Sequence, residues 1–178
     1  MDGSGALPDE PVIRIVVPGP PRGWQRGGHK IITPKDKTKK AFVSTFTRDA
    51  TRSEQGAIRM FAEQAMAGQA PFQGAVDMRY GAFFEIPPSW SAVKQRRAAA
   101  GMILPTVRPD FDNLMKQVDA LKGIVWRDDV QATDVHFWKR YAAHPRVVME
   151  IRLISPERLR REAAALASAA GLTEGWFG

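Results

Sequence analysis

The sequence contains no cysteine and only three histidines among its 178 residues. The absence of cysteine excludes disulfides, thiolate catalysis and cysteine-based zinc sites. The histidines, His29, His136 and His144, lie far apart in the sequence, so we expect no histidine-based transition-metal site. A metal bound by this chain would need oxygen ligands, which selects Mg²⁺ or Mn²⁺. The lack of cysteine also fits a reducing, cytoplasmic location.

Long apolar runs are missing as well. No apolar stretch approaches the roughly 18 residues of a membrane span, and the acidic start, MDGSGALPDEP, is unlike a signal peptide. Positive charge, in contrast, is abundant: 26 Lys and Arg against 19 Asp and Glu give a net charge of +7. This excess favours a polyanionic partner, of which nucleic acid is the commonest. We expect no membrane partner, because the best C-terminal amphipathic segment carries mostly alanine on its apolar face.

The length and the apolar pattern predict one α/β domain of mixed α+β character, with three or four strands and three or four helices. We expect a flexible tail over residues 1–10, the domain over 11–155, and a helical extension over 156–178. Strands are predicted at 11–19 and 75–87, and a hairpin is predicted from strands at 135–141 and 146–154. Residues 22–40 are rich in glycine and basic residues, which predicts a long loop or a loose hairpin.

Three helices are predicted outside the central segment. The first spans 47–67, and a short second helix follows Ser91 and ends at Gly101. The third starts at Ser155-Pro156-Glu157, where a cap, a proline and an early acid coincide. The first helix is expected to bury a stripe of small and apolar residues: Ala50, Ala57, Ile58, Phe61 and Ala65.

The segment VRPDFDNLMKQVDALKGIVWRDD, residues 107–129, is unusual because it crowds five aspartates into a basic protein. Such carboxylates repel one another unless a cation lies among them. Apolar residues at helical spacing predict a helix of about ten residues, with Asp112 at or near its N-cap. Asp110, two residues upstream after a proline, can point the same way. Only one of the two can cap the helix, so a bound cation would relieve the repulsion.

A third acid is expected to join this pair. Ten helical residues cover about 15 Å, and an extended return over 122–129 can span up to about 23 Å. Either Asp128 or Asp129 can therefore come back beside the pair, with its neighbour pointing away. Lys116, one turn after Asp112, is either a surface ion-pair partner or a contact to a scissile phosphate. Asp119 is expected to pair with Lys116 or Lys122 rather than to bind metal.

Three carboxylates and a lysine in a basic protein suit hydrolysis of phosphodiesters with oxygen-bound Mg²⁺. Trp24 and Trp90 are candidates for stacking on unpaired bases, whereas core packing is expected for Trp126 and Trp138. Two basic groups are candidates for DNA contact: Arg22 and Arg26 with the lysines at 30, 35, 37, 39 and 40 in the early loop, and Lys94, Arg96 and Arg97 before the acids.

The run RPDFDNLMKQVDALKGIVWRDDVQ closely resembles the signature of the RusA family of Holliday junction resolvases. VPGPPRGWQR and SWSAVKQRRAAAG also look like that family, and the likeness extends from about Val12 to Leu153. The resemblance implies a small domain with a mixed sheet flanked by helices. It further implies a homodimeric, Mg²⁺- or Mn²⁺-dependent endonuclease that cuts four-way DNA junctions symmetrically in recombination and repair. Such enzymes are often encoded by phages or prophages.

Carried over by position, the resemblance makes Asp110, Asp112 and Asp129 metal ligands and Lys116 the motif lysine. The spacing from Lys116 to the Asp-Ala-Leu run is one residue shorter than in some relatives, which affects the register of Asp119. The helix after Ser155 looks like an extension that could support a dimer. Two alternatives stay open: a nuclease for flaps or other branched DNA, and a junction-binding module without catalysis.

Overall fold

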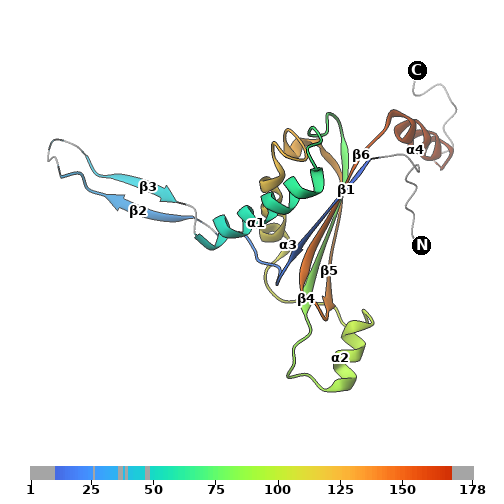
Figure 1. The fold of residues 1–178 in the computed structure, drawn as a ribbon, viewed down its shortest axis with the longest axis horizontal. Helices are drawn as coiled ribbons and strands as arrows, with labels where there is room; N and C mark the ends of the chain where they lie inside the picture. The colour runs from blue at the N-terminus through green and yellow to red at the C-terminus, as the bar shows by residue number, and fades with distance from the viewer. Residues whose placement is uncertain (1–10, 26, 36–37, 39, 47–48, 170–178) are drawn as a thin grey trace.

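The structure is a computed structural model that describes residues 11–25, 27–35, 38, 40–46 and 49–169. Four strands form one mixed sheet in the order β1-β6-β4-β5 (Figure 1). They are β1 (Val12–Pro18), β4 (Val76–Glu85), β5 (Ala132–Ala142) and β6 (Arg146–Leu153). β6 pairs antiparallel with both β1 and β4, while β4 and β5 are parallel. The fold is α+β in a single domain, as predicted.

The places of β1 and β4 in the sheet explain which of their residues are buried. β1 alternates, with Ile13, Ile15 and Val17 buried and the residues between them exposed, as expected for an edge strand that has one face in the core. β4 is buried on almost every residue because it lies between β6 and β5 and is covered on both faces. Both strands were correctly predicted from the sequence.

The predicted hairpin of β5 and β6 is wrong, because β4 lies between these two strands. Ala82 in β4 has Lys139 of β5 as its partner on one side and Val147 of β6 on the other. A strand as apolar as β4 gains most from being central, where both its edges are hydrogen-bonded and both its faces are buried. Glycine at position 81 also allows β5 to lie beside β4, since a Cβ there would lie 2.8 Å from ring atoms of Trp138.

Helix α1 (Asp49–Met66) packs on β1 and on the segment that follows α3. Its buried residues are Thr51, Ile58, Ala62 and Met66. Ala50, predicted to be buried, is exposed. The position next to it is buried instead, and the Thr51 hydroxyl accepts a hydrogen bond from the Gln25 N–H at 3.0 Å.

Two elements project away from the sheet in different directions (Figure 1). Strands β2 (Gly28–Ile32) and β3 (Phe42–Phe46) form a separate antiparallel ribbon, so the early basic segment is a hairpin. This ribbon brings the strand total above the three or four expected. Helix α2 (Ala92–Ala99) begins with its predicted cap, because the Ser91 hydroxyl accepts from the Lys94 N–H. Gly101 follows the helix with φ of 74°.

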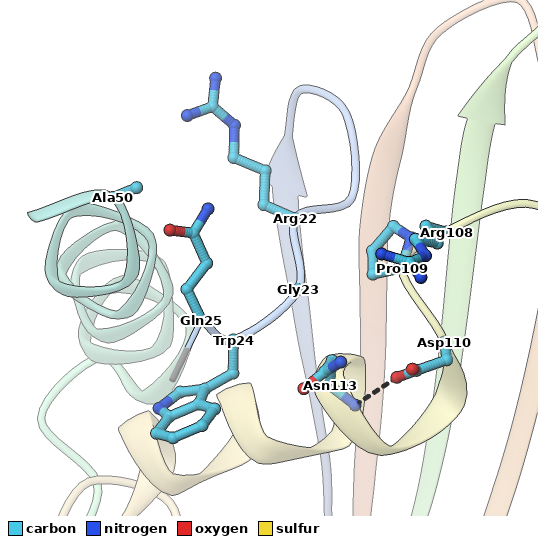
Figure 2. Close-up of a pocket in the computed structure, with 9 residues that line it drawn as sticks. All are labelled: Arg22, Gly23, Trp24, Gln25, Ala50, Arg108, Pro109, Asp110 and Asn113. Atoms are coloured by element: carbon cyan, nitrogen blue, oxygen red, sulfur yellow. Dashed lines mark hydrogen bonds between the residues drawn. The ribbon is translucent and has the colours of Figure 1, made fainter. Parts of the chain in front are cut away.

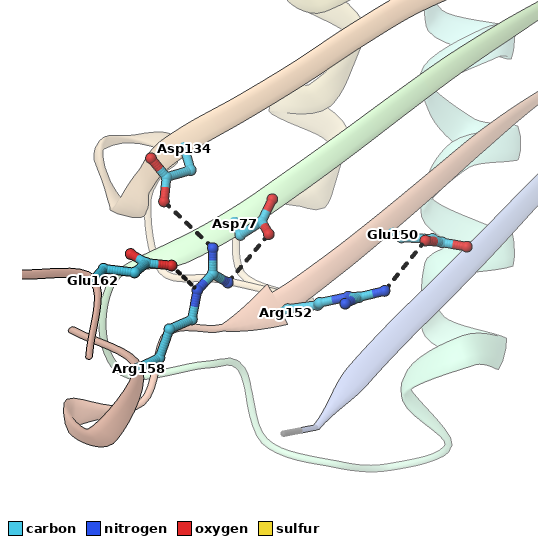
Figure 3. A network of polar contacts seen from close by, with 6 residues as sticks. All are labelled: Asp77, Asp134, Glu150, Arg152, Arg158 and Glu162. Carbon is cyan, nitrogen blue, oxygen red and sulfur yellow. Dashed lines mark hydrogen bonds and ion pairs between the residues drawn. The ribbon is translucent and has the colours of Figure 1, made fainter. Parts of the chain in front are cut away.

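Helix α4 (Pro156–Ala169) starts where the sequence predicted, with the Ser155 hydroxyl accepting from the Arg158 N–H at 3.1 Å. The Arg158 guanidinium joins the helix to the sheet (Figure 3). It lies 3.2 Å from a carboxylate oxygen of Asp77 in β4 and 3.7 Å from one of Asp134 in β5. Within α4 it contacts Glu162 at 2.7 Å. The predicted tail at residues 1–10 and the end of the extension at 170–178 lie outside the described residues. No described helix is long and apolar enough to cross a membrane.

Candidate active site

Asp110 and Asp112 lie at the start of helix α3 (Phe111–Met115), which continues as the 3₁₀ segment η1 (Lys116–Leu121). The N-cap is Asp110, and Asp112, which was predicted at or near the N-cap, is the second residue of the helix. Asp110 has extended backbone, and its Oδ1 accepts a hydrogen bond from the Asn113 N–H at 2.9 Å (Figure 2). Asp112 lies in the first helical turn, so both acids are near the positive end of the short helix.

An open pocket of about 920 Å³ lies beside Asp110, between the loop after β1, the start of α1 and the start of α3 (Figure 2). The loop is held close to α3, since the Trp24 N–H donates to the Asn113 carbonyl at 2.7 Å. Glycine is required at 23, because a Cβ there would lie 2.6 Å from the Pro109 Cβ. Two arginines, one tryptophan and one aspartate are among the residues that line the pocket: Arg22, Gly23, Trp24, Gln25, Ala50, Arg108, Pro109, Asp110 and Asn113.

Lys116 points back along the helix to Asp112. Its Nζ donates to Asp112 Oδ2, and the two form an ion pair with both side chains well exposed. The same Nζ lies 5.4 Å from the centroid of the Trp24 ring. The ion pair that was one of the two alternatives for Lys116 is therefore present, and the lysine lies near Trp24, which lines the pocket. An exposed pair of this kind contributes little to stability, about 0.3–0.5 kcal/mol.

Asp128 and Asp129 belong to a second group of charges. Lys122 Nζ lies 2.6 Å from Asp128 Oδ2, and this hydrogen bond lowers the pKa of Asp128 to about 2. The pKa of Asp129 is raised, chiefly by its hydrogen bond to Asp128 and then by burial and the charges of Asp128 and Asp119. Asp119 acts on Lys122 as a nearby charge, but the carboxylate that contacts Lys122 is that of Asp128.

The extended return predicted for residues 122–129 is wrong. The chain turns at Gly123, which has φ of 77°, and the Gly123 N–H donates to the Trp126 carbonyl at 2.7 Å. Trp126 is fully buried, as predicted, and its burial keeps the turn against the core. A one-turn segment, η2 (Asp129–Gln131), follows. The turn leaves Asp128 beside Lys122, at the end of η1.

The donor chemistry of these acids suits a hard divalent cation, because carboxylate oxygens are the ligands that Mg²⁺ and Mn²⁺ prefer. Their arrangement in this structure does not bring three of them together as metal ligands. Across the described ranges of the chain, no group of three or more histidine or acidic side chains is positioned to hold a metal ion. The set of Asp110, Asp112 and Asp129 therefore stays a prediction from the family signature.

The basic residues predicted to contact DNA fall in two places. Arg22 lines the pocket. Lys94, Arg96 and Arg97 are exposed on α2, which lies apart from the β2–β3 ribbon (Figure 1). The ring of Trp90 is engaged, with Lys94 Nζ 3.8 Å from its centroid and Tyr141 packed edge-on. Arg26, Lys37 and Lys39 lie outside the described residues. Trp138, predicted to lie in the core, is only partly buried.

Two side chains that support the acids were not singled out from the sequence. Gln131 accepts from the Arg127 N–H at 2.7 Å and donates to the Phe72 and Gly74 carbonyls, so it fixes the turn that carries Asp128 and Asp129. Its place in the quoted Asp-Asp-x-Gln run was the available signal. Lys139 of β5 donates to the Val107 carbonyl and, at 3.0 Å, to the Pro109 carbonyl. No local pattern connects Lys139 to the acids, because the contact joins positions about 30 residues apart.

Comparisons with known proteins add to this geometry. The sequence model of a family described as "Endodeoxyribonuclease RusA" matches residues 18–152, which include the five aspartates between 110 and 129. A protein of Bacillus subtilis (strain 168), "Uncharacterized protein YqaN", is 38% identical over 85 residues. The aligned region covers 46% of this chain and 60% of that relative, so the chain matches less than two thirds of the relative's length.

Proposed function

The chain belongs to the RusA endodeoxyribonuclease family, and from this membership we propose that it is a metal-dependent endonuclease that resolves four-way DNA junctions by paired nicks. The observation that carries the proposal is the family match over residues 18–152, which contains the Asp110–Asp112 pair at the head of α3. The exposed carboxylates, the open pocket and the excess of positive charge support it.

In the proposed reaction a water molecule adds to the scissile phosphorus and the bond to the 3′ oxygen breaks. Mg²⁺ or Mn²⁺ would activate the water and offset the charge of the phosphate oxygens. Asp110, Asp112 and Asp129 would hold the ion. Lys116 would exchange part of its contact with Asp112 for a phosphate oxygen, and Arg22 would contact the backbone of the strand at the pocket. Trp24 is the candidate for stacking on an unpaired base.

The β2–β3 ribbon supplies a second surface for DNA. Its lysines at 30, 35 and 40 are exposed, and the sequence of residues 27–46 has five lysines against one acidic residue, Asp36. A two-stranded ribbon has a width that the major groove admits. Each phosphate contact adds about 0.9 to the slope of log affinity against log salt. Replacing the three lysines by glutamine should therefore reduce the slope by up to about 3, measured by fluorescence anisotropy.

The direct test of the function is cleavage of labelled four-way junction, flap and duplex DNA with EDTA, Mg²⁺ or Mn²⁺. We expect nicking of the junction with either metal and none with EDTA. Asp110→Asn and Asp112→Asn should each lower the rate at least about 100-fold and leave junction binding intact. Glu157→Gln, which removes a charge on α4 away from α3 (Figure 1), is the control and should cleave normally. Full activity of either aspartate variant would remove that residue from the site.

Preferential cutting of flaps would indicate that the substrate is other branched DNA and not the four-way junction. Binding to junctions with no cleavage under any metal would favour the binding module instead.

Lys116→Ala should slow cleavage with little change in melting temperature. An unchanged rate would leave Lys116 with only its surface ion pair to Asp112.

A homodimer is part of the proposal. A four-way junction has approximate two-fold symmetry, and two opposed nicks need two active sites, which a C₂ dimer provides. Light scattering should give twice the chain mass of 19.7 kDa at assay concentrations. A monomer that still nicks flaps efficiently would contradict the dimer and favour the branched-DNA alternative.

A further inference from the structure

The segment that carries the two acids of α3 is attached to the sheet by two side chains of strand β5. Phe111, between the acids, packs edge-on against Phe137, with ring centroids 4.9 Å apart. Two residues further along β5, Lys139 reaches the same segment just upstream of Asp110. Residues two apart on a strand share a face, so β5 presents one apolar and one cationic contact to the loop.

Lys139 has an environment unlike that of an ordinary surface lysine. Its side chain is partly buried, and its Nζ lies 4.9 Å from the centroid of the Phe84 ring in β4. The ammonium donates to the carbonyls of Val107 and Pro109, which flank Arg108. Burial lowers the pKa of Lys139, while the charge of Asp110 opposes this shift. Partial burial of a cation has a cost, and the hydrogen bonds to these carbonyls and the charge of Asp110 offset it.

We propose that Lys139 is a positioning residue that fixes the carboxylate of Asp110 for the cleavage reaction. Lys139 holds the carbonyl immediately before Asp110, and the Asp110 side chain in turn caps the Asn113 N–H. Hydrogen bonds thus hold both the backbone just before Asp110 and the Asp110 carboxylate itself. Displacing a catalytic group by about 1 Å can cost on the order of 100-fold in rate. This inference rests on the proposed nuclease function.

The test uses Lys139→Met in the full chain, because methionine keeps an apolar stem over Phe84 and removes the ammonium donors. We expect kcat for junction cleavage to fall roughly 10- to 100-fold, with KM for the junction changed less than about threefold. In the metal-free protein without DNA, hydrogen exchange of the Asn113 amide should become faster, while amides of β4 and β6 keep their protection. The control is Arg140→Met at the exposed neighbouring position of β5, which removes one charge and a hydrogen bond to the Lys139 carbonyl and should leave both readouts unchanged.

Lys139→Arg is the second variant, in case the methionine variant does not fold. Its guanidinium keeps the charge and the N–H donors, so the fold should be retained, with cleavage and Asn113 protection both closer to the wild type than in Lys139→Met. The proposal requires kcat and the protection of Asn113 to change together in each folded variant. A loss of kcat with native protection of Asn113, or faster exchange with native kcat, would overturn it. Absence of cleavage by the wild type would instead refute the nuclease function, and unchanged Asn113 exchange in both variants would still refute the anchoring by Lys139.

Discussion

Replacing Arg158 by methionine should destabilise the protein strongly, because this arginine is the partner of a buried acid. Asp77 lies in the central strand β4 with 10% of its side chain exposed, and Arg158 from α4 has 13% exposed. Removing one partner of a buried ion pair costs about 3–5 kcal/mol. Both side chains keep some contact with water, which lowers the expected loss to about 2–4 kcal/mol. Methionine fills a similar length, so most of the loss would come from the unpaired carboxylate.

Urea unfolding at pH 7, followed by circular dichroism, measures this loss through the midpoint at constant slope. In a thermal scan each kcal/mol corresponds to about 2–4 °C for a chain of this size. The control is Glu162→Gln, since Glu162 contacts the same guanidinium from an exposed position and its pair should be worth less than about 0.5 kcal/mol. In the Asp77→Asn, Arg158→Met double variant, part of the stability should return because the buried charge is gone. A loss below about 1 kcal/mol for Arg158→Met, or a double variant no more stable than Arg158→Met, would refute the buried pair as the anchor of α4.

Two further predictions concern the surroundings of the acids. Gly23→Ala should lower kcat about 10-fold or more and shift the amide resonance of Asn113, because the new Cβ would displace the rigid ring of Pro109; a native rate and spectrum would show that the loop absorbs the methyl group. Asp128 should titrate at about 2 instead of its usual 3.8 in carbon-detected NMR. Because its folded pKa is depressed, its stabilising effect is complete above about pH 4 and is lost as the pH falls through 2. In Lys122→Met the titration should return towards 3.8, and an unchanged value would contradict the role of Lys122.

Features encoded by neighbouring residues could be predicted from the sequence. The alternation in β1, the cap at Ser91 and the start of α4 are each set by a few adjacent side chains. The RusA family, too, was correctly inferred from the acid segment. The sequence placed Asp112 at or near the N-cap but did not identify Asp110 as the cap itself, because that choice depends on packing at a distance. Contacts to the loop from Gly23 and Lys139 fix the backbone before α3, and neither is near Asp110 in the sequence.

The order of the strands could not be predicted from local sequence patterns either, because it also depends on contacts between distant residues. β5 and β6 are separated by a short connection, which usually favours a hairpin. Only the competition of β4 for both of their edges decides against it, and that competition involves pairings across 50 or more residues. The prediction that residues 122–129 return in an extended conformation was wrong for a different reason. The distance was sufficient for an extended chain, but burial of Trp126 made a tight turn at Gly123 more favourable than extension.

The second group of charges distinguishes the two neighbouring aspartates. The carboxylate of Asp128 is compensated by Lys122, and its lowered pKa reflects that contact. Asp129 has a raised pKa because the hydrogen bond to Asp128, burial and nearby negative charge all oppose its ionisation. Because Lys122 already compensates the charge of Asp128, we expect Asp129, which holds the position of the family signature, to be the metal-binding residue of the two. Asp129→Asn should abolish nicking and retain junction binding, while Asp128→Asn should reduce the rate only mildly. The opposite ranking in the cleavage assay would make Asp128 the metal-binding residue.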